Sequence, residues 1–281
     1  MSFSSDIKEQ LCTVRHKCKN CACAELSGIF EFAGKYEDGG ARFITENETV
    51  AKHVVKTIYD SFGDLTEYRE GSRSRQFFLD NKRVIDSIVG WERSARECCK
   101  KAYVRGAFLG GGSVTDPKRG YHIEFDTRYA AQAEKLAEIL RDNGIEARYT
   151  DRKDIKLVYI KECEKIADTL GFMGATGGAM ELFSVQIARD MRNNINRRVN
   201  CETANADKTA KAATRQAAAI KKIKSRGKWN TISESLREIG ELRLQNPDMG
   251  LKELGALANP PIGKSGVNHR LNRIIRFAEE I

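Results

Sequence analysis

The chain has 281 residues, of which 41% are hydrophobic, and its 48 Lys and Arg outnumber its 39 Asp and Glu to give a net charge of +9. This length allows one large core and a small additional module. No apolar run approaches the roughly 20 residues that span a bilayer, which argues against a membrane protein. Residues 1–6 lack the basic and apolar regions of a secretory signal, so the eight cysteines are interpreted as thiols in a reducing, cytoplasmic compartment.

Two segments, residues 24–34 and 102–112, share one pattern: an alanine, a glycine four residues later, an apolar turn and a closing glycine. Small residues at helical spacing let two helices approach until their backbones nearly touch. The two segments are separated by 78 residues, and positions further along, such as Gly63 and Gly144, by 81. A slightly longer loop in the second copy, at residues 114–120, accounts for the difference. The sequence therefore predicts two pseudo-symmetric repeats packed through these helices.

Each repeat is expected to contain a helix, a strand, a helix, a strand and a helix. Apolar side chains at helical spacing predict helices, for example at Val50–Ile58 and Ala133–Leu140. Runs of β-prone residues predict the strands, at residues 42–45, 76–79, 122–125 and 156–160. We expect the repeats at about 20–90 and 98–171, within a domain of residues 1–190.

A group of potential metal ligands precedes the first motif helix and consists of His16, Cys18, Cys21 and Cys23. Cys-x2-Cys with a nearby histidine is suggestive of zinc. However, no second Cys-x2-Cys or His-x3-His follows to complete the usual arrangement. Cys21 is also the repeat equivalent of Cys99, and free cysteines are often buried as small hydrophobic side chains. We therefore favour buried thiols over a metal site and expect no cofactor.

The excess positive charge is concentrated in one segment. Residues 1–191 hold 30 basic and 30 acidic side chains, and residues 229–281 hold 7 of each, whereas residues 192–228 hold 11 basic and 2 acidic ones. The Ala-rich, Pro-free stretch Ala204–Ile223 within it predicts a helix. A solvated linker helix is one interpretation, but so many charges in one connector favour an arm that contacts DNA phosphates. We assign the linker to residues 191–230, and its candidate DNA contacts are Arg197, Arg198, Lys221 and Lys222.

Residues 231–281 have the pattern of a helix-turn-helix domain. A first helix ends at Asn246-Pro247, a short second helix ends at Asn259-Pro260-Pro261, and a third begins near Gly263. The third helix has an apolar stripe on one face, formed by Val267, Leu271, Ile274, Ile275 and Ala278. These three helices would enclose a small core of their own.

The remaining face of the third helix is rich in hydrogen-bond donors, and Lys264 to Phe277 contains no acid. Such side chains read base edges and phosphates in the major groove. The polar exterior of an ordinary three-helix bundle would mix in glutamates. We therefore predict that this helix is the main DNA reader, with candidate contacts at Lys264, Ser265, Asn268, His269, Arg270, Asn272, Arg273 and Arg276.

The sequence resembles two known protein families in these features. The paired helices resemble the LAGLIDADG homing endonuclease fold, and the order of the whole chain resembles the WhiA family. The similarity to WhiA covers essentially all of the chain and is carried by residues 1–5, 106–109, 196–205, 251–255 and 264–271. The resemblance implies an α+β fold with pseudo-twofold LAGLIDADG-like αββα repeats and a curved antiparallel sheet. A basic helical linker and an all-α helix-turn-helix domain would follow.

Resemblance to WhiA also implies a function. Members are sequence-specific DNA-binding transcriptional regulators of Gram-positive bacteria, linked to cell division, chromosome segregation and, in spore-formers, sporulation. The implied partners are double-stranded promoter DNA, the RNA polymerase sigma factor and a sporulation coregulator, with no membrane. The implied location is the cytoplasm, in association with the nucleoid.

The resemblance further indicates that nuclease chemistry has been lost. Homing endonucleases place one carboxylate at the end of each motif helix to bind a divalent metal, and the resemblance puts Ala33 and Gly111 at these positions. Glu31, Asp116 and Glu124 lie nearby in the sequence and are interpreted as surface charges. We therefore expect no enzyme activity, no catalytic residue and no metal. Two alternatives stay open: a residual metal-dependent endonuclease, and a polymerase-bound coregulator with weak DNA contact.

Overall fold

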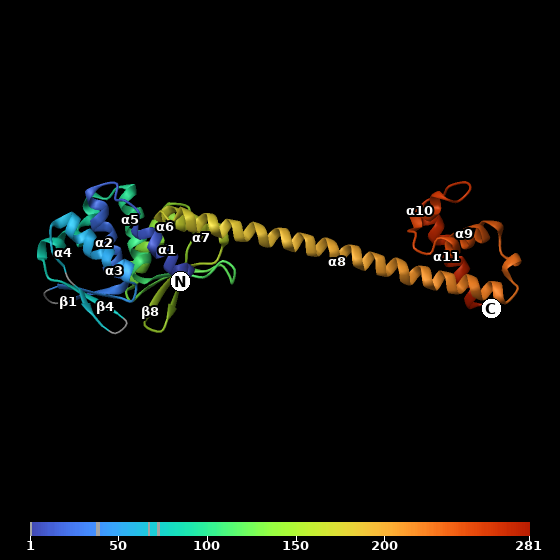
Figure 1. Ribbon diagram of the computed structural model, residues 1–281, viewed down its shortest axis with the longest axis horizontal. Helices are drawn as coiled ribbons and strands as arrows, with labels where there is room; N and C mark the ends of the chain where they lie inside the picture. Colours follow the sequence, from blue (N-terminus) through green and yellow to red (C-terminus); the bar gives the residue numbers. More distant parts are fainter. Residues whose placement is uncertain (1, 38–39, 67, 72–73) are drawn as a thin grey trace. The chain divides into compact units, whose positions relative to one another are not determined.

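The computed structural model describes residues 2–37, 40–66, 68–71 and 74–281 (Figure 1). The chain divides into two compact units, residues 1–190 and 191–281. One helix, α8 (Thr176–Ser225), contributes to both units. Within the described ranges, no helix combines the length and the apolar character needed to cross a membrane.

The N-terminal unit starts with helix α1 (Phe3–Cys12) and then contains two repeats with the order helix, hairpin, helix, hairpin, helix. The first repeat consists of α2 (Lys19–Ala33), β1 (Gly34–Glu37), β2 (Gly40–Thr45), α3 (Glu48–Phe62), β3 (Tyr68–Glu70), β4 (Arg75–Leu79) and α4 (Lys82–Val89). The second consists of α5 (Glu97–Gly111), β5 (Gly112–Val114), β6 (Ile123–Thr127), α6 (Ala130–Asp142), β7 (Arg148–Arg152), β8 (Ile155–Ile160) and α7 (Cys163–Met173). A short 3-10 turn, Trp91–Ser94, lies between them.

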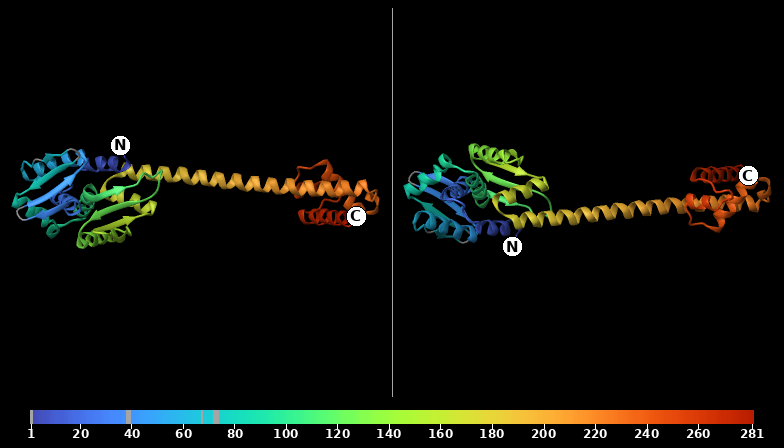
Figure 2. Two further views of the ribbon diagram at one scale, coloured as in Figure 1. Left: turned by 90° about the horizontal axis from the view of Figure 1, so that it is seen from below. Right: turned by 90° about the horizontal axis from the view of Figure 1, so that it is seen from above.

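Each repeat forms a four-stranded antiparallel sheet, in the order β1-β2-β4-β3 and β5-β6-β8-β7. The two sheets lie beside each other (Figure 2). Phe43 pairs with Phe77 in the first sheet, and Phe125 pairs with Val158 at the equivalent place in the second. All four side chains are buried in one core. The predicted α+β class and the pseudo-twofold repeat are therefore confirmed.

The sequence predicted a single strand wherever the structure has a hairpin. The four predicted strands correspond to β2, β4, β6 and β8, which are the inner strands of the two sheets. The outer strands lack the signal on which the prediction depends. Every residue of β7 is exposed, and β5 has only 3 residues, so neither shows a buried β-prone run.

Helices α2 and α5 pack against each other at the centre of the N-terminal core. At Gly28, a β-carbon would lie 2.6 Å from the backbone nitrogen of Ala107, and at Gly106 it would lie 2.8 Å from the carbonyl carbon of Glu25. Both distances are too short for any side chain. The small residues that recur in the two segments thus permit direct contact between the two helix backbones.

A charged group is buried inside this helix pair. Glu25 on α2 is fully buried, and its carboxylate accepts hydrogen bonds from His16 (3.1 Å), His53 and Arg105. Burial by itself raises the pKa of Glu25, but the hydrogen bonds from both histidines and the charge of Arg105 outweigh it and hold the pKa far below its ordinary value. Arg105 also donates to the carbonyl oxygen of Met173 (3.2 Å). The cluster therefore ties α2, α3, α5 and α7 together.

Helix α8 has 50 residues and is much longer than the stretch Ala204–Ile223 that composition predicted. No proline occurs between Pro117 and Pro247, so no proline interrupts the helix. Leu182 near its start is buried in the N-terminal core, whereas Ile220 and Ile223 near its end are buried in the C-terminal one.

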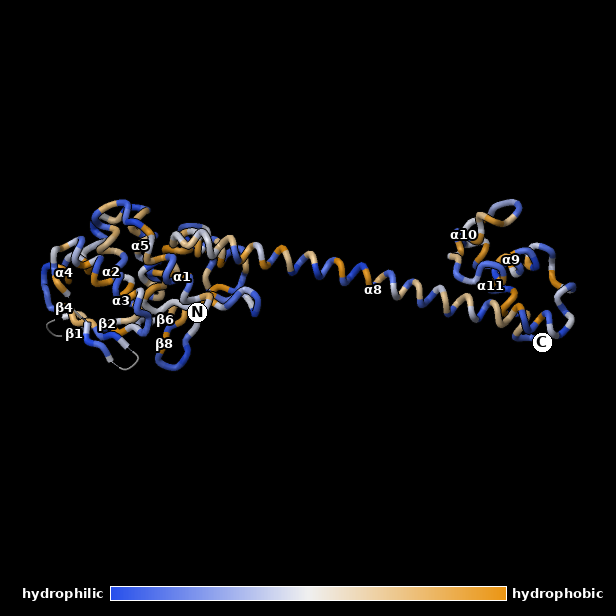
Figure 3. The backbone as a smooth tube through the Cα atoms, viewed as in Figure 1, coloured by the Kyte–Doolittle hydropathy of each residue, from blue (hydrophilic) through white to orange (hydrophobic). Residues whose placement is uncertain are grey.

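Between these two buried ends, residues 190–208 of α8 are exposed on every side. Apolar side chains nevertheless recur at every fourth position, at Ile187, Met191, Ile195 and Val199, each at least half exposed. They contribute to the regularly spaced apolar bands along α8 in Figure 3.

The C-terminal unit contains the three predicted helices, α9 (Glu234–Gln245), α10 (Leu251–Ala256) and α11 (Lys264–Glu279), after a 3-10 turn at Trp229–Thr231. Their apolar faces and the last turns of α8 enclose a second core. Arg243 is almost completely buried there, and its Nη1 donates to the carbonyl oxygens of Asn246 (3.3 Å), Pro247 (3.2 Å) and Met249 (2.8 Å). Arg243 thereby holds the turn between α9 and α10.

Candidate nucleic-acid interface

Helix α11 has one buried face and one exposed face. The buried face contains the predicted stripe, namely Val267, Leu271, Ile274, Ile275 and Ala278. The exposed residues include seven of the eight predicted DNA contacts, namely Lys264, Ser265, Asn268, His269, Asn272, Arg273 and Arg276. The helix begins at Lys264, immediately after Gly263. Its free backbone N–H groups and the positive end of its dipole therefore lie at the same end as Lys264 and Ser265.

Arg270 is the predicted contact that lies apart from the others. It is only partly exposed, its Nη1 lies 3.7 Å from Glu238 Oε2, and the same atom donates to the carbonyl oxygen of Ser235 (3.5 Å). Both partners are on α9. Arg270 therefore holds α11 against α9 within the domain.

A groove of about 680 Å³ joins α8 to the amino-terminal ends of α10 and α11. Asn205 and Lys208 of α8 line it together with Lys264 and Asn268 of α11. A further lysine, Lys252 of α10, lines the same groove. Periodicity could not have singled out Lys252, because only the folded domain places it beside the other two lysines.

Some basic side chains of α8 are bound to other residues, whereas others are exposed without a partner among the described residues. Lys222 donates from Nζ to the carbonyl oxygen of Ala278 (2.7 Å), and Arg215 pairs with Glu279 (3.0 Å), so both are bound to the end of α11. Arg198 pairs with Glu202 one turn away (3.0 Å), in an exposed ion pair of small energetic value. Arg197 and Lys221 are exposed and have no side-chain partner in the part of the chain that the structure describes.

The N-terminal unit has a cleft of about 350 Å³ at the end of α2, beside Ala33. Its charged lining includes three exposed basic residues, Lys35, Arg42 and Arg128. On α5, a β-carbon at Gly111 would lie 2.9 Å from the carbonyl oxygen of Phe32, so this position is closely packed. The two residues at which the resemblance implies metal-binding acids, Ala33 and Gly111, thus offer no ligand atom, and Glu31 is the acid that lines this cleft.

The acids that lie near these helix ends are bound to other groups of the protein. Glu31 accepts hydrogen bonds from Ser27 (2.7 Å) and Tyr103 (2.7 Å) and pairs with Lys135 (2.8 Å). Because Glu31 is partly buried and has three partners, it is not the surface charge that the sequence indicated.

The second repeat provides no replacement pair. Glu124 contacts His122 (3.1 Å) and Ser113 (3.0 Å), and Asp116 accepts a hydrogen bond from the backbone of Lys118 (2.8 Å). Asp126 is a further acid on β6, and burial raises its pKa.

Comparison with known proteins identifies both units. The family model for the WhiA LAGLIDADG-like domain matches residues 100–192, and the model for the WhiA C-terminal HTH domain matches residues 195–278. A crystal structure of full-length DUF199/WhiA from Thermotoga maritima has a TM-score of 0.68 and 25% identity, and the match covers 100% of this chain and 99% of that one. The crystal structure of the N-terminal LAGLIDADG domain of a DUF199/WhiA protein shares the fold. Its TM-score is 0.55 and its identity 20%, and the match covers 62% of this chain and 90% of that one.

Two curated relatives are similar over their whole length. Both are named "Probable cell division protein WhiA". The protein from Clostridium novyi is 38% identical over 312 aligned positions, covering 100% of this chain and 98% of the relative. The protein from Heliobacterium modesticaldum is 38% identical over 307 positions, covering 99% of this chain and 96% of the relative. With a C-terminal helix-turn-helix domain, a degenerate LAGLIDADG-like domain and this identity from end to end, the chain belongs to the WhiA family.

Proposed function

We propose that this protein is a sequence-specific DNA-binding transcriptional regulator that uses α11 as its base reader. The observation that carries the proposal is the exposed face of α11, where donor-rich side chains project away from a fully apolar buried face. A helix-turn-helix domain places such a helix in the major groove. The name of the relatives supports a role in cell division.

The finer parts of the proposal rest on the resemblance to WhiA. They are control of cell division, chromosome segregation and sporulation genes, contact with the RNA polymerase sigma factor and a sporulation coregulator, and association with the nucleoid in the cytoplasm. Genome-wide occupancy would name the genes. Co-purification of the intact protein with RNA polymerase would test the contact with the sigma factor.

We also propose that the protein does not cleave DNA. Hydrolysis by a LAGLIDADG nuclease needs two carboxylates that hold divalent metal between the helix ends, and here those positions are Ala33 and Gly111. Glu31 is neutralised by Lys135. Magnesium-dependent cutting of bound DNA that disappeared after Glu31→Gln or Glu124→Gln would instead establish the residual-endonuclease alternative.

Changing Asn272 and Arg273 to alanine should relax sequence preference. Each bidentate base contact provides about 1–3 kcal/mol of discrimination, so the affinity for a selected site should fall about tenfold or more while non-specific affinity changes little. Binding to selected and to scrambled DNA measures both. Arg148→Ala on β7 is the charge-matched control, because Arg148 is exposed in the other unit. Unchanged promoter occupancy in the double variant would favour the coregulator alternative.

Changing Arg197 and Lys221 to alanine should weaken binding to all DNA sequences alike. Both side chains are exposed on α8, and each lost phosphate contact lowers the slope of log affinity against log salt by about one. Lys222→Ala serves as a contrast, because Lys222 binds the end of α11 and its loss should lower domain stability. A salt slope that did not change in the Arg197 and Lys221 variant would rule out α8 as a phosphate-binding arm.

A further inference from the structure

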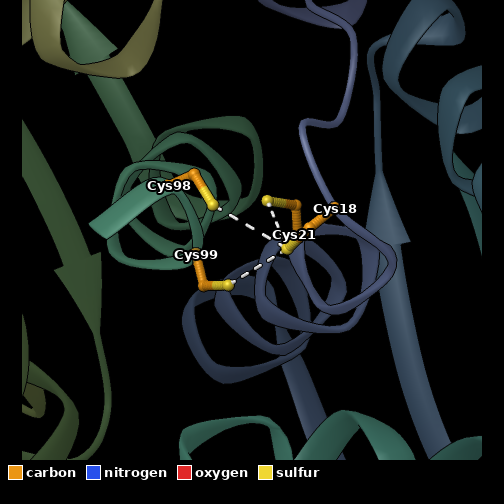
Figure 4. Close-up of side chains that lie close together, drawn as sticks. All are labelled: Cys18, Cys21, Cys98 and Cys99. Atoms are coloured by element: carbon orange, nitrogen blue, oxygen red, sulfur yellow. Dashed lines mark hydrogen bonds between the residues drawn. The ribbon is translucent and has the colours of Figure 1, made fainter. Parts of the chain in front are cut away.

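Four cysteines from two distant parts of the sequence come together at one end of the α2–α5 pair (Figure 4). The sulfur of Cys18 lies 3.5 Å from that of Cys21, 3.8 Å from that of Cys98 and 3.6 Å from that of Cys99. All four sulfurs lie within 4.8 Å of one another. The sequence placed His16 and Cys23 beside Cys18 and Cys21 as potential ligands, but His16 is bound to Glu25 and Cys23 is outside the cluster.

All four cysteines lie at the N-terminal ends of helices, where thiolates are stabilised. Cys18 is the N-cap of α2 and Cys21 is in its first turn, while Cys98 and Cys99 are in the first turn of α5. Both helix dipoles therefore have their positive ends at the sulfur cluster, where they stabilise thiolates. Cys21 and Cys99 are buried, and Cys18 and Cys98 are partly exposed, which leaves a side from which an ion can enter.

We propose that Cys18, Cys21, Cys98 and Cys99 bind one Zn²⁺ ion as a structural site. Four thiolates are a common ligand set for structural zinc, and Zn–S bonds of about 2.3 Å in a tetrahedron place the sulfurs about 3.8 Å apart. The three sulfur separations from Cys18 lie close to this value. A four-iron cluster would attach its cysteines to different irons and spread them more widely.

The surroundings of the sulfurs suit a charged metal–thiolate centre. Asn20 lies with its Nδ2 3.7 Å from the sulfur of Cys99 and donates from the same atom to the carbonyl oxygen of Trp91 (2.8 Å). Such second partners orient metal ligands. Four thiolates and one Zn²⁺ carry two negative charges, and the small cavity that contacts Cys21 and Cys98 is also lined by Arg15, Lys17 and Lys101.

Duplication of the repeat does not account for the cluster. Cys21 and Cys99 are equivalent positions, but Cys18 corresponds to Arg96 and Cys98 to Asn20. Two of the four thiols have therefore been placed independently, one in each repeat, where they complete a single tetrahedron. The site would fasten the two repeats together at the end of the helix pair opposite Ala33 and Gly111.

Metal analysis of the full-length protein, purified under reducing conditions without chelator, tests this proposal. We expect one zinc per chain, which is released when the thiols are modified. The zinc-bound protein should have four fewer rapidly reacting thiols than the metal-free protein. Cobalt added to the metal-free protein should give the intense absorption of a tetrahedral thiolate site. Cys18→Ser and Cys98→Ser, both at partly exposed positions, should lose these properties, whereas the control Cys23→Ser should keep them.

Asn20→Ala gives a second and milder test, because it leaves all four sulfurs in place. Zinc affinity should fall about tenfold without loss of the cobalt spectrum. The proposal fails if zinc-exposed protein retains no metal after gel filtration, or if Cys18→Ser binds zinc as tightly as Cys23→Ser. An iron–sulfur absorption spectrum, or a disulfide among these cysteines in freshly purified protein, would equally overturn it.

Discussion

Replacing Gly106 with alanine should unfold the N-terminal unit or destabilise it by about 4 kcal/mol, a large part of the roughly 5–15 kcal/mol that holds a domain together. The new β-carbon would meet the backbone of Glu25, including its carbonyl carbon at 2.8 Å. A flexible side chain can move away, but a helix backbone cannot do so without separating α2 from α5. Denaturant unfolding followed by near-ultraviolet circular dichroism measures the loss.

Gly171→Ala provides the matched control. Gly171 is also a helical glycine, on α7, and a β-carbon there meets no atom within 4 Å. Alanine has the higher helix propensity, so this variant should be neutral or more stable by about 0.5–1 kcal/mol. If the Gly106→Ala protein were as stable as the Gly171→Ala protein, the inference that the backbones of α2 and α5 are in direct contact would be wrong.

Changing Arg105 to alanine should have the second largest effect. It removes the cationic partner of Glu25, which is completely buried. Breaking a buried ion pair by removing one member costs about 3–5 kcal/mol, because the remaining charge is left in a medium of low dielectric constant. Glu202→Gln, which breaks the exposed pair with Arg198, should leave the unfolding midpoint unchanged.

The same cluster predicts how stability depends on pH. The pKa of Glu25 is depressed in the folded protein, from an ordinary value of 4.5. The stabilisation is therefore complete above the ordinary pKa and is lost as the pH falls below it towards the depressed value. Glu25→Gln should be less stable than the natural protein at neutral pH, and the difference should shrink on acidification below about pH 4.5. A difference that was constant over this range would exclude an ionised Glu25.

The sequence predicted those helices and strands whose own residues show a clear hydrophobic pattern or a proline boundary. The inner strands contain buried β-prone runs such as Gln76–Leu79, and the helices of the C-terminal unit are bounded by Pro247 and Pro260. The outer strands of both sheets are short or polar because they pair on one side only. Their structure is imposed by their neighbours and leaves little periodicity in the sequence.

In the candidate interface, too, some features follow from one segment of the sequence and others depend on contacts between segments. The exposed side of α11 follows from the spacing of its apolar stripe, and the sequence was sufficient to identify it. The sequence could not show that Arg270 is bound to α9, that Lys222 binds the end of α11, or that Lys252 lines the groove. Likewise the four sulfurs gather because α2 and α5 are in contact, although Cys18 and Cys98 are far apart in the chain.

Helix α8 also contributes to the core of the helix-turn-helix domain. Ile220 and Ile223 belong to the C-terminal core, so a fragment that started at residue 231 would lack one wall of that core. The last turns of α8 and helix α11 thus belong to one folding unit. If α8 contacts phosphates as proposed, its charge can be changed without disturbing this core only on the faces of the helix that do not pack against it.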